Sequence, residues 1–310
     1  MQAPILIKGN PTRVHQLTTA LAMMDLPVTL LCEDQDENAE LLGTRACRHF
    51  RLEALKPDAD LSMIDTLIYL PALDFYAQSE TDATKIAPLL APEIDELRTM
   101  TNDVMERAFQ GKIIVNAPHD EVFLYFLASF SGLDVNKLMG VGNVPVGLML
   151  REQLIDNFKV SDEDVNVSAC GLNTNCVLAW NRIYVGSSSL LSYVASPTNN
   201  YDTDLIGKVQ QTVTDPQVVV NPVLQIQAIV KLLACLTGAE SAVHAVVSLE
   251  KKSDQIALNQ MPKLVNCSGL AHELPFKLAD AEADELDYNL NWSTEIIEQI
   301  KKERQHEEAH

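Results

Sequence analysis

Short runs of aliphatic and β-branched residues alternate with longer amphipathic segments along the first half of the chain. After the first run, apolar residues recur at Val14, Leu17, Leu21 and Met24, which is the spacing of one face of a helix. Runs that alternate with helices in this way predict parallel strands joined by helical crossovers, an α/β arrangement. The predicted strands cover residues 5–7, 28–31, 66–70 and 112–115.

The second half has a different pattern. An apolar helix is predicted at residues 223–236 and ends before Gly238, and three short apolar runs follow it. These runs predict antiparallel strands, and a last amphipathic helix is predicted at residues 292–300. We therefore expect an α+β second half. The three runs cover residues 244–249, 255–258 and 263–267.

Three motifs in the middle of the chain stand in a specific order. Asn-Ala-Pro at residues 116–118 ends the fourth predicted strand, and Ser-Gly-Leu at residues 131–133 ends an apolar helix. Val-Ser-Asp-Glu-Asp-Val at residues 160–165 then precedes a loop that begins at Gly171. This order resembles the NAD-dependent lactate and malate dehydrogenases, where Asn-Pro ends a strand, Ser-Gly-Leu ends a helix, and V-S-x-E-D-V precedes a Gly-Glu-His-Gly-Asp loop.

The resemblance extends over nearly the whole chain and implies two domains. Residues 1–141 correspond to a Rossmann-like domain with a doubly wound parallel sheet, which binds NAD in that family. Residues 142–310 correspond to the α+β C-terminal domain of lactate and malate dehydrogenases. The resemblance also implies an oxidoreductase acting on 2-hydroxy and 2-oxo acids.

The family's three catalytic residues are replaced in this chain. Counting from Gly142, the orienting aspartate falls on Val146 and the substrate arginine on Met149; counting from Gly171, the catalytic histidine falls on Asn173. An amide can orient a ligand but does not accept a proton near neutral pH. The sequence thus predicts a pseudoenzyme with no catalytic residues at the family positions, which acts by binding a ligand or a partner.

Two other functions stay open. The first is an active NAD-dependent oxidoreductase with a relocated site, for which His119 is a candidate base. Its neighbour Asp120 is not expected to orient it, because adjacent side chains point apart. The second is a structural subunit that pairs with an intact paralogue.

The first predicted turn lacks the glycines of a dinucleotide-binding loop. Residues 8–13 read Lys-Gly-Asn-Pro-Thr-Arg, so on the simplest register the three glycines of G-x-G-x-x-G become Lys8, Asn10 and Arg13, and Pro11 has no N–H for a phosphate. No cofactor is expected, and NAD is implied by resemblance only. If a nucleotide binds, the residues that the resemblance assigns to it are Gly9, Asn10, Arg13, Glu33 and Asn116.

Positive charge gathers at the same turn. Lys8 and Arg13 lie beside a helix start that Thr12 is expected to cap, so a small anion is one expectation there. The alternative, which we favour, is that Lys8 and Arg13 fill or salt-bridge an emptied nucleotide groove. Arg151 is a third candidate anion ligand, since allosterically regulated bacterial lactate dehydrogenases bind a phosphorylated effector nearby with a histidine, here replaced by Asn166.

Composition restricts the partners. A formal charge of −20 disfavours binding to nucleic acid and to anionic membranes. No apolar run has membrane-spanning length and no targeting segment is recognised, so a cytoplasmic protein is expected. The six cysteines form no Cys-x-x-Cys pair, so reduced core thiols and no metal site are expected. The apolar helices at residues 148–155 and 223–236 favour a homodimer or a homotetramer.

Overall fold

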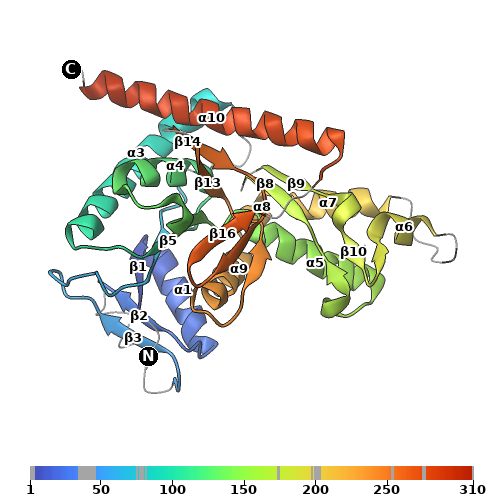
Figure 1. Cartoon of the computed structure of the whole chain (residues 1–310), viewed down its shortest axis with the longest axis horizontal. Helices are drawn as coiled ribbons and strands as arrows, with labels where there is room; N and C mark the ends of the chain where they lie inside the picture. The colour runs from blue at the N-terminus through green and yellow to red at the C-terminus, as the bar shows by residue number, and fades with distance from the viewer. Residues whose placement is uncertain are drawn as a thin grey trace.

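The first half of the chain forms one parallel sheet. The computed structural model describes residues 4–33, 47–74, 76, 80, 82–172, 175–196, 198, 204–252, 255–273 and 277–308. Six parallel strands lie in the order β3-β2-β1-β4-β5-β6 (Figure 1). This order confirms the predicted doubly wound, Rossmann-like sheet. The strands are β1 (Ile5–Gly9), β2 (Thr29–Cys32), β3 (Arg51–Ala54), β4 (Thr66–Leu70), β5 (Lys112–Val115) and β6 (Leu138–Gly140).

Helices cover both faces of this sheet because successive strand residues point to opposite sides. Leu6 packs against α3 (Ala83–Glu106), α4 (Asp120–Ser131) and α10 (Asp280–Glu308). Its neighbour Ile7 packs on the other face, against α1 (Pro11–Met23) and α9 (Pro222–Leu236). Burial on both faces explains why the predicted strands are continuous apolar runs.

The second half consists of helices and short antiparallel ladders, as predicted. Two boundaries differ from the prediction. The expected strand at 244–249 is two strands, because the chain leaves one sheet after His244 and enters another at Ser248. The last helix, α10, is longer than the predicted residues 292–300 and spans Asp280–Glu308. The other elements are α5 (Val144–Phe158), β7 (Val165–Asn166), β8 (Ala169–Leu172), β9 (Asn175–Leu178), β10 (Tyr184–Val185), β11 (Ser188–Ser189), α6 (Leu190–Ala195), α7 (Leu205–Val213), α8 (Pro216–Val220), β12 (Ala242–His244), β13 (Ser248–Lys252), β14 (Gln255–Asn259), β15 (Lys263–Asn266) and β16 (Gly269–Glu273), with 3₁₀ turns at Val135–Lys137, Asp162–Asp164 and Trp180–Arg182.

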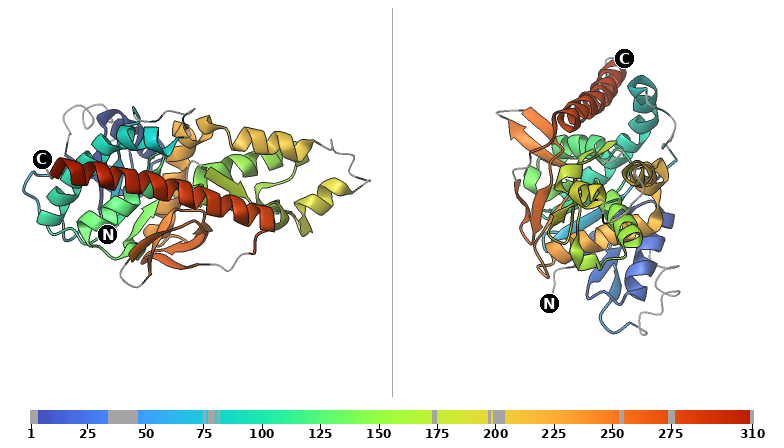
Figure 2. Two further views of the ribbon diagram at one scale, coloured as in Figure 1. Left: turned by 90° about the horizontal axis from the view of Figure 1, so that it is seen from above. Right: turned by 90° about the vertical axis from the view of Figure 1, so that its right-hand side faces the viewer.

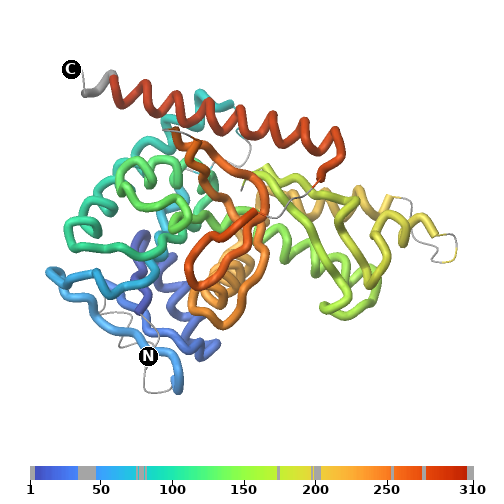
Figure 3. The backbone as a smooth tube through the Cα atoms, in the orientation of Figure 1, coloured from blue at the N-terminus to red at the C-terminus, as the bar shows by residue number. Residues whose placement is uncertain are grey.

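The two halves share packing. Asp120, which is fully buried at the start of α4, accepts a hydrogen bond of 2.7 Å from the backbone N–H of Gly142. A side chain at Gly140 would meet that carboxylate at 2.5 Å. Helix α10 returns along the outside of the molecule to the first half (Figures 2 and 3), where Arg304 pairs with Asp95 of α3 at 2.5 Å. The predicted domain boundary near residue 142 therefore lies inside a continuous core and stays a prediction.

The described helices give no single segment that is long and apolar enough to cross a membrane. The ranges Leu205–Val220 and Pro222–Leu236 reach the required length and composition only together, and they meet at an angle of 84°. Helix α9, the second of these ranges, packs against the parallel sheet.

Gly9 is required by its surroundings, because its φ is +129° and an added Cβ would lie 2.0 Å from the carbonyl oxygen of Leu70. We expect Gly9→Ala to lower the free energy of unfolding by more than about 3 kcal/mol, since backbone strain and a steric clash add. The matched control is Gly132→Ala, which also has a positive φ but has nothing within 4 Å. Its expected cost is about 1 kcal/mol. Urea unfolding of both variants measures the difference, and equal losses would contradict the close approach at Gly9.

Candidate functional site

A cavity lies where the carboxyl ends of β1, β4 and β5 face helices α8 and α9. This edge contains the point at which the strand order reverses, the usual ligand position in such sheets. The cavity has a volume of about 240 Å³. Most of its walls are aliphatic, and four polar side chains reach it. The lining residues are Arg13, Gln16, Leu17, Leu70, Leu73, Asn116, Pro118, Val219, Val220, Pro222, Gln225, Ile226 and Ile229.

Arg13 spans this edge from the first turn of α1. Its Nη1 donates to the carbonyl oxygen of Pro71 at 2.7 Å and its Nη2 donates to Oδ1 of Asn116 at 2.5 Å. Burial lowers the pKa of Arg13 to about 10, so the guanidinium stays charged at neutral pH. Within the described ranges no carboxylate pairs with it, and both acceptors are neutral oxygens. Arg13 is therefore a half-buried cation with no carboxylate partner among the described residues.

The buried amide of Gln225 holds the side chain of Asn116 in position. Asn116 donates from Nδ2 to Oε1 of Gln225 at 2.6 Å, and Gln225 donates from Nε2 to the carbonyl oxygen of Val219. Asn116 and Gln225 are only 1% and 8% exposed. Because each amide nitrogen has an acceptor, the carbonyl oxygen of Asn116 is directed at Arg13. The chain of hydrogen bonds joins α1, the end of β5 and α9.

The turn between β1 and α1 satisfies its own N–H groups. The side chain of Asn10 accepts from the N–H of Thr12 at 3.1 Å and of Arg13 at 3.3 Å. The expectation that Thr12 caps this helix is wrong, because Asn10 is the N-cap. Asn10 precedes Pro11, which has no N–H, so the donors that bind a phosphate at a helix start are already used or missing. Of the glycines in a dinucleotide-binding turn only Gly9 is present, and its backbone packs closely against Leu70 of β4.

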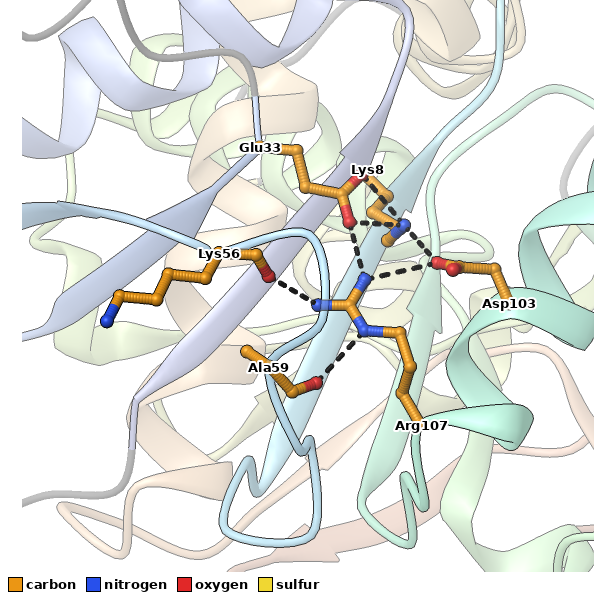
Figure 4. A network of polar contacts seen from close by, with 6 residues as sticks. All are labelled: Lys8, Glu33, Lys56, Ala59, Asp103 and Arg107. Carbon is orange, nitrogen blue, oxygen red and sulfur yellow. Dashed lines mark hydrogen bonds and ion pairs between the residues drawn. The ribbon is translucent and has the colours of Figure 1, made fainter.

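Lys8 takes part in an ionic network of four residues on the face of the sheet that α3 covers (Figure 4). Its Nζ lies 2.8 Å from Glu33 and 2.7 Å from Asp103. Arg107 follows α3, and its Nη1 lies 2.8 Å from Glu33 and 3.4 Å from Asp103. Glu33, the residue expected to bind the adenosine ribose, is thus paired with two cations. Lys8, for its part, is shared by two carboxylates.

This network is partly buried, and its charges compensate one another. Burial alone would raise the pKa of Asp103, but the Lys8 ammonium and the Arg107 guanidinium outweigh it and lower the pKa below its usual value. Arg107 also donates to the carbonyl oxygens of Ala59 and Lys56 at 3.0 and 3.1 Å. The network therefore joins β1, the end of β2, the last turn of α3 and the loop at residues 56–59. Sequence reasoning missed Arg107, although its spacing of four residues from Asp103 on a helix was a usable signal.

The family's catalytic positions lie elsewhere. Val146 is 2% exposed and packs with Leu150 in the core of the second half, and Met149 packs against the same cluster. Asn173 lies outside the described residues. Arg151 on α5 pairs with Asp162 at 3.2 Å and does not line the cavity. Val146 and Met149, which the sequence analysis aligns with the orienting carboxylate and the substrate arginine, thus belong to an apolar core.

His119 is enclosed by aromatic rings. It is 5% exposed, and its ring centroid lies 5.6 Å from that of Trp292 and 6.2 Å from that of Tyr76. Its Nδ1 lies 3.6 Å from the fully buried Glu121, whereas Asp120 turns toward Gly142. The side chains of His119 and Asp120 thus point apart, as the sequence predicts. The carboxylate that does approach His119 is Glu121, which sequence reasoning missed.

A separate group of potential metal ligands lies at the far end of α9. Among the residues that the structure describes, Cys235, Glu240 and His244 place one ligand atom each within 4.8 Å of one another. These residues belong to none of the motifs described in the sequence analysis. They do not line the cavity.

Comparisons with known proteins identify the fold. No family model matches this chain, and no curated protein matches it. Solved structures do. A lactate dehydrogenase, MGS-M5, from a Medee basin deep-sea metagenome library superposes with a TM-score of 0.82 at 16% identity, over 97% of this chain and 100% of that chain.

Two further structures agree. The minor L-lactate dehydrogenase from Enterococcus mundtii in its ligand-bound form gives a TM-score of 0.80 at 13% identity, over 96% of this chain and 98% of that chain. The L-lactate dehydrogenase from Clostridium thermocellum gives 0.73 at 16% identity, over 97% and 100%. From end to end, the chain has the fold of the lactate dehydrogenases.

Proposed function

We propose that this protein is a catalytically degenerate relative of the lactate and malate dehydrogenases that binds a small organic carboxylate in the cavity beside Arg13. The observation that carries the proposal is the charge of Arg13, which is half-buried and has no carboxylate partner among the described residues. Burying an uncompensated charge costs stability. Such a cost is typical of a site that a ligand of opposite charge completes.

The donors of Arg13 fit a carboxylate. A guanidinium carries five N–H groups, and the described residues accept from only two of its nitrogens. The remaining donors permit a forked contact with two carboxylate oxygens, which is among the stronger hydrogen-bonded pairs in proteins. Gln16, at the cavity wall, offers a further amide for a hydroxyl or a carbonyl next to the carboxylate.

The size and the walls of the cavity restrict the rest of the ligand. A volume of about 240 Å³ is below the roughly 300–1,000 Å³ of pockets for drug-sized molecules. The aliphatic walls favour a short apolar substituent, because a second charge there would be desolvated without a partner. We therefore expect a short-chain monocarboxylate with a neutral tail.

The same residues disfavour NAD. The pyrophosphate would need N–H groups at the start of α1 that Asn10 already engages, and the ribose would need Glu33, which binds Lys8 and Arg107. Admitting the cofactor requires breaking these contacts. The gain from binding is reduced by that cost.

Turnover is disfavoured as well. Without a general base the rate falls by roughly two to four orders of magnitude, and Val146 and Met149 leave neither an orienting carboxylate nor a substrate cation. A relocated base at His119 would have to act from behind Trp292 and Tyr76. We therefore favour a binding function over a relocated dehydrogenase site.

The first test concerns Arg13. Isothermal titration of the full chain with lactate and pyruvate should detect binding, whereas lactamide, which has the same shape without the charge, should bind at least tenfold more weakly. Arg13→Met should weaken the binding of the acids at least tenfold, because it removes the forked contact. Arg151→Met is the matched control, since it removes an arginine outside the cavity. Equal binding of acid and amide, or full affinity in Arg13→Met, would overturn the carboxylate site.

The second test concerns the dehydrogenase chemistry. The purified protein should not oxidise or reduce lactate, malate, pyruvate or oxaloacetate with either nicotinamide cofactor, and NADH fluorescence titration should give no dissociation constant in the low micromolar range. Asn173→His alone should not restore turnover, because Val146 cannot fix the tautomer of the new imidazole and Met149 cannot hold the substrate carboxylate. Robust turnover by the unmodified protein, followed by absorbance of the reduced cofactor, would mean that a relocated base exists.

A further inference from the structure

Three residues of different types converge where helix α9 ends and strand β12 begins. The Sγ atom of Cys235 lies 3.5 Å from Nε2 of His244 and 3.9 Å from Oε1 of Glu240. The three ligand atoms all lie within 4.8 Å of one another. A thiolate, an imidazole and a carboxylate are the three side-chain groups that bind zinc in proteins.

The local backbone explains why they converge. Gly238 follows the helix with a φ of +80° and reverses the chain. The N–H groups of Ala239 and Glu240 both donate to the carbonyl oxygen of Ala234, at 2.9 and 3.2 Å. The loop is thereby folded back on the last turn of α9, and Glu240 is carried to the side of Cys235. The arrangement does not depend on a bound ion for its backbone geometry.

The two distances from the sulfur atom are close to those of a tetrahedral centre. With Zn–S near 2.3 Å and Zn–N near 2.0–2.1 Å, tetrahedral angles give a sulfur-to-nitrogen separation of about 3.5 Å and a sulfur-to-oxygen separation of about 3.6 Å. The first separation is the one observed, and the second requires Oε1 of Glu240 to move by a few tenths of an ångström. Glu240 is exposed, so this movement meets little resistance and solvent reaches the fourth position.

A divalent cation would bind at the expense of one proton. The metal ligand is the thiolate and not the thiol, so Cys235 would release its proton to solvent, and the thiolate and the Glu240 carboxylate would neutralise the cation.

We propose that Cys235, Glu240 and His244 form a site for a zinc-like divalent cation, with water as the fourth ligand. The cation would fasten the C-terminal end of α9 to β12. This site is separate from the cavity, because Gln225 and Cys235 are ten residues apart on α9, about 15 Å along its axis. The proposal contradicts the sequence expectation of no metal site, which rested on the missing Cys-x-x-Cys pair.

The proposal is tested with Zn²⁺ and Co²⁺ alone, added to untagged full-length protein that has been treated with a chelator. Zinc should bind with a stoichiometry of one and raise the melting temperature. Titrations in two buffers of different ionisation enthalpy should show release of about one proton per Zn²⁺ near pH 7. Cobalt should give a thiolate-to-metal charge-transfer band in the ultraviolet and the visible bands of a tetrahedral ion.

The variants locate the site. Cys235→Ala should abolish the charge-transfer band, and Glu240→Gln and His244→Gln should each weaken zinc binding at least tenfold. If Cys235→Ala harms folding because Cys235 is buried, Glu240→Gln still tests the site, since Glu240 is exposed. Cys47→Ser and His272→Gln are matched controls at other positions and should bind as the unmodified protein does. No charge-transfer band in the unmodified protein, or an undiminished band in Cys235→Ala, would overturn the proposal.

Discussion

The burial of the Arg13 charge at the switch point of the sheet is the constraint on which the site depends. The guanidinium keeps its proton at neutral pH although burial lowers its pKa to about 10, and in the part of the chain that the structure describes it donates only to neutral oxygens. Asn116 must therefore present its carbonyl oxygen, and it can do so only because Gln225 takes its amide nitrogen. A charge on α1 thus dictates the orientation of side chains on β5 and α9. A carboxylate ligand would neutralise the charge that this arrangement leaves open.

The three residues that stand for glycines in the first turn have separate physical consequences. Lys8 pairs with Glu33, the residue that the resemblance assigns to ribose binding, so this carboxylate already has a cation partner. Asn10 caps α1, so the helix start has no free donors for a pyrophosphate. Arg13 reaches across to the ends of β4 and β5, where it lines a cavity of about 240 Å³. Gly9 keeps the turn close to β4, because an added Cβ there would meet the carbonyl oxygen of Leu70.

Sequence reasoning predicted the fold well because hydrophobic periodicity reports burial, and burial on both faces of a parallel sheet gives long apolar runs. The favoured alternative, that Lys8 and Arg13 fill or salt-bridge the groove, agrees with the ion pairs of Lys8, whereas Arg13 bonds to neutral oxygens among the described residues. Sequence reasoning missed the pairing of Arg107 with Glu33, because a contact between residues 74 positions apart leaves no local pattern. It missed Glu121 for another reason, since a carboxylate two residues from His119 is not singled out by its spacing. The group of Cys235, Glu240 and His244 is local in sequence, and it escaped notice because it mixes three residue types and no pair shows a familiar metal spacing.

Helix α9 relates the two proposed sites, and its rigidity decides how they can interact. Its first turns carry Gln225, which orients Asn116, and its last turn carries Cys235. A cation bound at the far end would restrain the loop after Gly238 and leave Gln225 in place, since α9 is packed along its length against the sheet. Coupling between sites requires an element with two arrangements that both ligands bias. A single packed helix supplies continuity but no second arrangement, so carboxylate affinity should be insensitive to the cation.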